Sequence, residues 1–237
     1  MKKILLFITA VSCTALAQIT ITSSDMANTF AVGNNAENHQ DTLISSINIG
    51  SLGGGNSWDF TMIQSDITGT VTSVDPATTP FFSDFPGANF ANHTVTTNQG
   101  TTLDLYFYLR LNDSLGYIGS GLTNNILPGF VTFVMNDPDL IQAVLPMTYN
   151  TNWNENFTQT VINEFNGNPI STITSTISNS AVVDAYGTMT LPNIPVLDVL
   201  RLREETTITT NSISTTFTTF TFISREGAGV AVTAVVP

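Results

Sequence analysis

Side chains that could carry acid–base or nucleophilic chemistry are few in this sequence. It has two histidines, His39 and His93, and both lie in polar, Asn-rich stretches that predict solvent-exposed loops. A Ser or Cys nucleophile needs a positioned base and a group that orients the base, and the chain contains no Gly-x-Ser-x-Gly elbow. With 18 acidic residues, chance carboxylate pairs are expected, so such a pair alone does not predict a glycosidase. We therefore predict that the protein is not an enzyme.

One acidic segment has the composition of a calcium site. Asn136-Asp137-Pro138-Asp139 brings three oxygen-bearing side chains together in what reads as a turn, and Ca²⁺ prefers carboxylate, amide and carbonyl oxygens. Asp137 and Asp139 are the predicted ligands. Asn and Asp also stabilise turns by bonding to nearby backbone, which explains the same residues without a metal. Calcium is the only cofactor that the sequence suggests, and no cofactor is the alternative.

Two arginines share one face of a predicted strand. Between residues 196 and 205 the alternation of side chains places Arg201 and Arg203 on a half-apolar face. Cations on such a face need carboxylate partners if they are buried, and the candidates are Asp184, Glu204 and Glu205. The pattern favours a structural ion pair over a site that binds an anion.

The elements that would position these residues begin after a predicted signal peptide, residues 1–17. Two lysines precede a short apolar run, residues 4–11, and Ala15-Leu16-Ala17 is a small-x-small cleavage site. The segment ending at Cys13 is a loose lipobox, so lipidation and membrane anchoring through that cysteine are the alternative to ordinary cleavage. No later segment has the roughly 18 apolar residues of a transmembrane helix.

Cleavage at this site changes the predicted surface. Both lysines leave with the signal peptide, so four arginines remain against 18 acidic residues, and the net charge moves from −12 to −14. Such a surface is a poor partner for nucleic acid or an anionic bilayer, which attract cationic surfaces. Without Cys13 the mature chain has no cysteine, which excludes disulfides and zinc–thiolate sites.

Residues 18–237 are predicted to form a single all-β domain. Charged residues make up only 10% of the chain and threonine takes their place; this β-branched residue fits a pleated, half-buried surface. From about residue 152 onward, long strand patterns follow one another across short turns, which favours an antiparallel meander. Strands of this length must curl or pack on a second sheet, so we predict a β-sandwich or a partly closed barrel.

The clearest strand pattern is Thr101–Leu111, whose odd positions from Leu103 onward are apolar. Its even positions include Tyr106 and Tyr108, which predicts one buried face and one wetter, aromatic face. Turn signals separate the strand patterns at Asn112-Asp113-Ser114, Asn166-Gly167-Asn168-Pro169, Asn193-Ile194-Pro195 and Asn211-Ser212.

Three other segments carry local predictions. Residues 80–91 and 138–145 could each supply one turn of helix. The Pro- and Phe-rich region 75–98 is predicted to be a long loop packed over the sheet. The alternative for this region is an exposed aromatic patch. Trp58 and Phe60 should anchor the core from one strand face, and Gly187 suggests a bulge or a close backbone approach.

Several motifs together resemble a known family. They are Gln18–Asp25, Leu52–Phe60, Val74-Asp75-Pro76, Val183–Pro192 and Val199–Arg203. They are similar to the N-terminal modules of secreted Bacteroidetes proteins that carry a type A sorting domain for the type IX secretion system. The resemblance implies a cell-surface or released β module and supplies no catalytic residues. The sorting domain itself is absent before Pro237, so we expect either a fragment of a longer protein or a periplasmic one.

Three functions follow as hypotheses. The first is a non-catalytic, exported surface module for adhesion, for contact with an extracellular glycan or protein, or for spacing. The second is a carrier or receptor for an apolar ligand inside a curved sheet or barrel. The third is a glycoside hydrolase that uses two carboxylates facing each other across a cleft.

Overall fold

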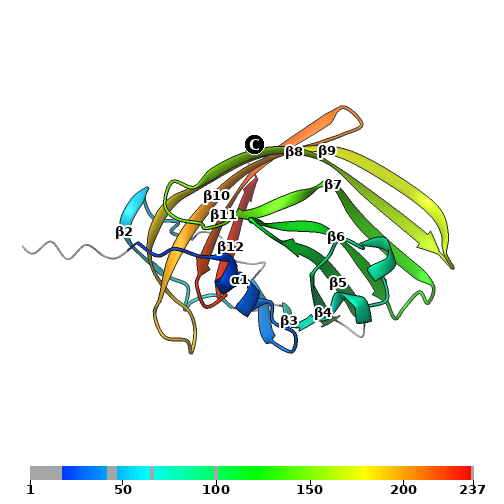
Figure 1. Ribbon diagram of the computed structural model, residues 1–237, viewed down its shortest axis with the longest axis horizontal. Coiled ribbons are helices and arrows are strands. Elements are labelled where there is room, and N and C mark those ends of the chain that lie inside the picture. Colours follow the sequence, from blue (N-terminus) through cyan, green and yellow to red (C-terminus); the bar gives the residue numbers. More distant parts are fainter. Residues whose placement is uncertain (1–17, 42–46, 65–66, 99–100, 236–237) are drawn as a thin grey trace, which may run out of the picture.

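The computed structural model of the chain describes residues 18–41, 47–64, 67–98 and 101–235. These residues form one 12-stranded sheet that bends into an arch and does not close (Figure 1). The predicted all-β antiparallel meander is confirmed. The predicted signal peptide and Cys13 lie outside the described residues.

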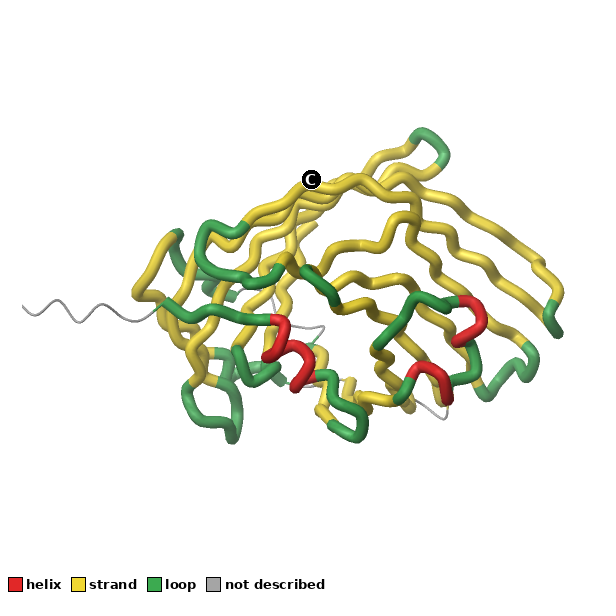
Figure 2. Tube along the Cα trace, in the orientation of Figure 1, coloured by secondary structure: helices red, strands yellow, loops and turns green. Residues whose placement is uncertain are grey.

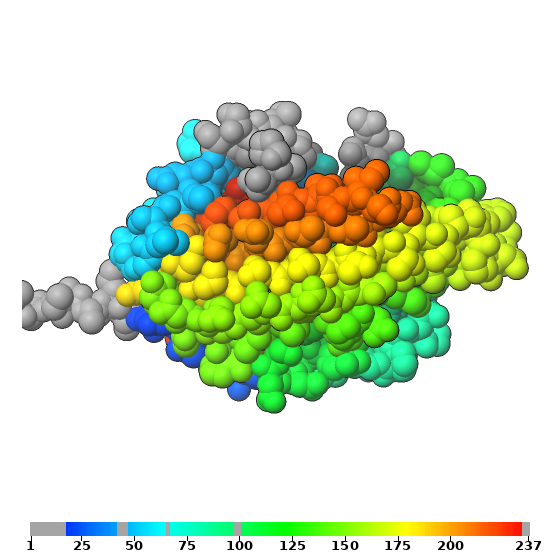
Figure 3. Space-filling model, turned by 90° about the horizontal axis from the view of Figure 1, so that it is seen from above, coloured from blue at the N-terminus to red at the C-terminus, as the bar shows by residue number. Residues whose placement is uncertain are grey.

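The strands lie in the sheet almost in chain order. That order is β1 (Asn35–Gln40), β3 (Ile67–Val74), β4 (Phe90–Asn98), β5 (Thr101–Leu111), β6 (Ser114–Asn124), β7 (Phe130–Val144), β8 (Asn152–Phe165), β9 (Asn168–Thr190), β10 (Leu197–Thr210), β11 (Ile213–Ser224) and β12 (Gly229–Val235). One strand is out of order: β2 (Gly53–Asp59) pairs in parallel with the end of β9. Seen from above, β8 to β11 lie side by side along the top of the arch, with β2 at one end (Figure 3).

Short turns join the long strands, as the sequence predicts. The β8–β9 turn is Asn166-Gly167 and the β10–β11 turn is Asn211-Ser212, with positive φ at both residues of each. Two-residue turns with two positive φ angles match the twist of the strands that they connect. The predicted turns at residues 112–114 and 193–195 also join strands, although Ser114 is already the first residue of β6. Asn168 and Pro169, predicted as part of the β8–β9 turn, are the first residues of β9.

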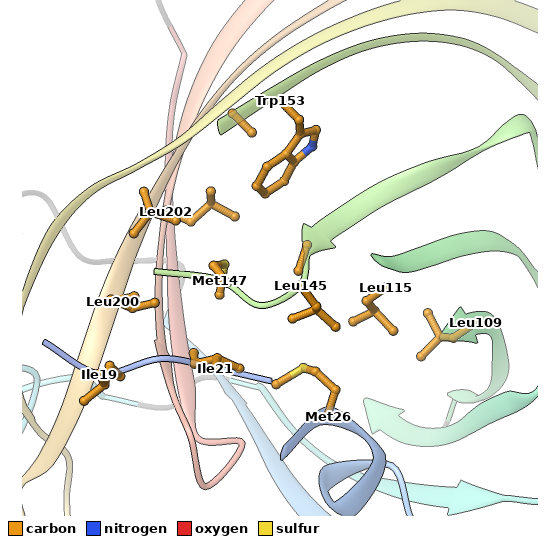
Figure 4. Close-up of a cluster of buried hydrophobic side chains, with 13 residues drawn as sticks. Ile19, Ile21, Met26, Leu109, Leu115, Leu145, Met147, Trp153, Leu200 and Leu202 are labelled. Atoms are coloured by element: carbon orange, nitrogen blue, oxygen red, sulfur yellow. The ribbon is translucent and has the colours of Figure 1, made fainter. Parts of the chain in front are cut away.

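The N-terminal segment packs against the inner face of the arch. Ile21 exchanges two backbone hydrogen bonds with Met147, and helix α1 (Ser23–Thr29) follows at once, its first turn closed by a capping box between Thr22 and Asp25. Figure 2 shows α1 on the open side of the arch. Side chains from this segment meet the inner face of the sheet in a cluster that includes Ile19, Ile21, Met26, Leu109, Leu145, Met147, Trp153, Leu200 and Leu202 (Figure 4).

The prediction of a wetter aromatic face on β5 is wrong. Tyr108 is fully buried, because the segment before β4, with its short helices η1 (Pro76–Thr78) and η2 (Phe82–Asp84), packs over it. The Phe85 ring stacks on Tyr108 at 4.4 Å, and the Tyr108 hydroxyl accepts a hydrogen bond from the Phe81 backbone N–H at 3.2 Å. The predicted packing of this aromatic segment is therefore confirmed, although its last part, residues 90–98, is a strand.

The prediction of a helical turn in residues 138–145 is also wrong, because β7 runs through Val144. Residues 136–139 bulge out of the β6–β7 pairing, where Gly119 pairs with Met135 and Tyr117 with Leu140. The other helical-turn prediction, residues 80–91, contains η2.

Trp58 and Phe60 are core residues, as predicted. Both are 2% exposed, and both rings contact Phe222 edge to face at about 5 Å. Gly187 lies where β2 passes β9, and a Cβ atom at this position would overlap the backbone carbonyl of Asn56. The predicted close backbone approach at Gly187 is thus confirmed.

Candidate functional site

A hollow of about 650 Å³ lies over strands β9 to β11. Its floor carries Asp184, Arg201, Arg203 and Phe220, and its walls are the segment 49–52 before β2 and the β7–β8 loop with Tyr149 and Asn150. We call this site the arginine hollow. Leu200 and Leu202 belong to the inner cluster, so the arginines that alternate with them on β10 point to the outer face of the sheet.

A β-bulge brings Asp184 into this hollow. Val183 pairs with Leu202 and Ala185 with Arg201, so Asp184 is the extra residue of β9. Val183 consequently packs in the inner cluster and Ala185 in the outer cluster around Trp58, although regular alternation would put them on the same face. Bulges re-aim side chains in this way, and here the result is a carboxylate beside the outer-facing arginines.

Arg201 is held on all sides. Its side chain is 2% exposed, its Nε donates to Asp184 Oδ1 at 2.7 Å and its Nη1 donates to the Ile49 backbone oxygen. The guanidinium also lies 5.4 Å from the centroid of the Phe220 ring, a cation–π contact. The predicted pairing of an arginine with Asp184 is confirmed. Arg201 therefore has little capacity left for a ligand.

Arg203 is different, because 44% of its side chain is exposed. Its Nε lies 3.6 Å from Asp184 Oδ2, an ionic contact that is too long for a hydrogen bond. Asp184 Oδ2 is buried and accepts no hydrogen bond from the described residues. One carboxylate therefore contacts two guanidinium groups, and among the described residues the Arg203 guanidinium has no hydrogen-bond acceptor.

The wall formed by segment 49–52 is fixed by side chains of β2. The Ile49 backbone oxygen accepts from Trp58 Nε1 at 2.9 Å as well as from Arg201, and the Ser51 backbone N–H donates to Asn56 Oδ1 at 3.0 Å. Gly50 has φ +74°, and a Cβ atom there would overlap Trp58 and Asn56. The outer aromatic cluster thus positions the rim of the site.

Two partly buried acids meet on the inner face of the sheet. Burial raises the pKa of both Glu155 and Glu204, and both carboxylates bond to the side-chain amide of Asn179, which donates to Glu155 Oε1 at 3.3 Å. Thr206 completes the group by donating to Asn179 Oδ1 at 3.0 Å. The amide occupies the space between the acids, where a glycosidase would hold the scissile bond.

The histidines lie in strands, which corrects the prediction of loops. His39 is in β1, where it contacts Glu37 at 3.0 Å, and His93 is in β4. His93 Nε2 is 3.0 Å from Asp104 Oδ1, and its ring stacks on Tyr106 at 4.3 Å. Each histidine therefore sits beside a carboxylate.

The predicted calcium ligands lie in the β7 bulge and not in a turn. Asp139 pairs with Arg110 at 2.9 Å, and Asn136 bonds to the Tyr117 backbone oxygen and to Gln159. Asp137 is exposed. In the described part of the chain no three His, Cys, Asp or Glu side chains group as metal ligands do. Calcium binding by Asp137 and Asp139 stays a prediction.

Comparisons with known proteins found no matching family model, no curated relative and no similar solved structure. Within the described residues, no helix is both long enough and apolar enough to cross a membrane.

Sequence reasoning found part of this site and missed the rest. It placed Arg201 and Arg203 on one face and named Asp184 among their partners, but it did not bring Tyr149, Asn150 or segment 49–52 to them. The pairing of β2 with β9 positions segment 49–52, and a hydrogen bond from the Asn150 backbone N–H to the Val183 backbone oxygen holds the β7–β8 loop on β9. The glycines of segment 50–55 were the only signal in the sequence for a tightly folded rim.

Proposed function

We propose that the protein is an exported, non-catalytic binding module that contacts an extracellular glycan in the arginine hollow. One observation carries this proposal: two of the four arginines of a strongly acidic chain gather around one carboxylate in a hollow on the outer face. The hollow also offers aromatic, amide and hydroxyl groups from Phe220, Asn150 and Tyr149, the mixture that ligand sites use. The resemblance to secreted Bacteroidetes modules supports export of the protein.

A glycan array with the chain expressed from Gln18 tests this proposal. We expect a subset of glycans to bind, and we expect binding to weaken when Arg203 is replaced by Gln. The bound glycans should remain intact after prolonged incubation with the protein, as judged by mass spectrometry. Release of shorter products would contradict the non-catalytic assignment.

A second candidate is a carrier for an apolar ligand on the inner face of the arch. Beyond the part filled by the N-terminal segment, Leu105, Phe107, Val161 and Phe217 are only half buried, and their strand positions place them on the face of the inner cluster. Binding of a fluorescent fatty acid tests this candidate. Val161→Glu places a charge on this apolar face and should prevent the binding. If the unaltered protein fails to bind the probe, this candidate is wrong.

A further inference from the structure

We infer that the arginine hollow selects an acidic sugar, a uronate residue, and that Arg203 binds its carboxylate. This inference rests on the proposed function, since it names the ligand class of the same site.

The charges of the hollow favour an anion. Of the described residues that line it, Arg201 and Arg203 are cationic and only Asp184 is acidic. The hollow therefore has an excess of one positive charge, within a chain whose net charge is −12. One carboxylate from a ligand would balance this excess, whereas a neutral sugar would leave it unchanged.

Arg201 and Arg203 have different roles in the hollow. Arg201 is buried and spends its donors on Asp184 and on the Ile49 backbone oxygen, so it acts as a positioning residue. The side chain of Arg203 donates no hydrogen bond to any described residue and is 44% exposed. A guanidinium has five N–H donors in a planar fork, which matches the two oxygens of a carboxylate. Asp184, at 3.6 Å, holds this fork at the floor of the hollow.

The remaining walls suit a sugar ring. A volume of about 650 Å³ is in the usual range for small-molecule sites, which combine aromatic walls with a few polar groups. Phe220 and Tyr149 provide aromatic surface, and Asn150 provides an amide that can bond to ring hydroxyls. These groups lie beside Arg203, so one ligand that carries both hydroxyls and a carboxylate can contact all of them.

Titration calorimetry with matched ligands tests the inference. The ligands are trisaccharides of galacturonate, glucuronate and mannuronate, each compared with its methyl ester, which lacks the negative charge and carries one added methyl group on each carboxyl group. We expect at least one uronate to bind about tenfold or more tightly than its ester, because a hydrogen bond to a charged group is worth that factor or more. Arg203→Gln should weaken the acid to the level of its ester.

Two variants serve as controls. Arg203→Lys keeps the charge but loses the fork, so its affinity should fall between those of the unaltered protein and Arg203→Gln. Arg225→Gln changes an exposed arginine that bonds to the Thr20 backbone oxygen outside the hollow, and it should leave the affinity unchanged. Circular dichroism should show that all three variants fold.

The outcomes separate this inference from the proposed function. Equal binding of acid and ester, or a binding loss in Arg225→Gln as large as in Arg203→Gln, would overturn the inference. If sulfated or neutral glycans bind in the hollow and uronates do not, the inference is wrong and the proposed function stands. If no glycan binds, both fail.

Discussion

Replacing Asp184 by Asn should destabilise the protein more than any other single charge removal on the outer face. The new side chain has the same size, but it leaves the guanidinium of Arg201, which is 2% exposed, without its counterion. Breaking a buried ion pair by removing one partner costs about 3–5 kcal/mol. The carboxylate also contacts Arg203, so two cations lose their common neighbour.

Urea denaturation followed by tryptophan fluorescence measures this effect. With a slope of about 2 kcal/mol per molar urea, the midpoint should fall by about 2 M. Asp139→Asn is the matched control, because its pair with Arg110 is more exposed and should contribute only about 0–1 kcal/mol. A combined Asp184→Leu and Arg201→Met variant should recover most of the loss. Equal losses in Asp184→Asn and Asp139→Asn would refute the reasoning.

Three further predictions concern stability. Burial raises the pKa of Glu204, so the folded protein binds the Glu204 proton more tightly than the unfolded chain does. The free energy of unfolding therefore falls as pH rises from about 4.3 through the folded pKa. Glu204→Gln should reduce this fall and stabilise the protein near neutral pH, as measured by urea midpoints across that pH range. Gly187→Ala should lower the melting temperature because its Cβ overlaps the Asn56 backbone, and an unchanged melting curve would contradict the close approach. Trp58→Ala should cost about 3–5 kcal/mol through the cavity it leaves, and a calorimetric loss below about 1 kcal/mol would show that Trp58 is not a core anchor.

The strands and turns were predictable because local patterns determine them. Alternating side chains and Asn-Gly turns gave β5, the β8–β9 hairpin and the antiparallel meander. The shared face of Arg201 and Arg203 followed from the same alternation. Because a buried arginine needs a carboxylate, Asp184 could be named as a partner before its position was known.

The remaining features depend on contacts between distant segments. No local pattern marks Asp184 as a bulge, because Val183 and Ala185 fit either face equally well. The burial of Tyr108 depends on the segment before β4 packing over β5, which the alternation within β5 does not reveal. One wall of the arginine hollow, segment 49–52, likewise depends on the parallel pairing of β2 with β9, between segments more than 100 residues apart.

The most direct test of the binding site is the NMR signal of each arginine side chain during titration with a uronate trisaccharide. The chain expressed from Gln18 has four arginines and no lysine, so the Nε–Hε spectrum contains few signals to assign. We predict that the Arg203 signal shifts and sharpens as its guanidinium is fixed, while those of Arg110 and Arg225 stay in place. If no arginine signal moves, or if all of them move together, Arg203 is not the ligand-binding residue of this protein.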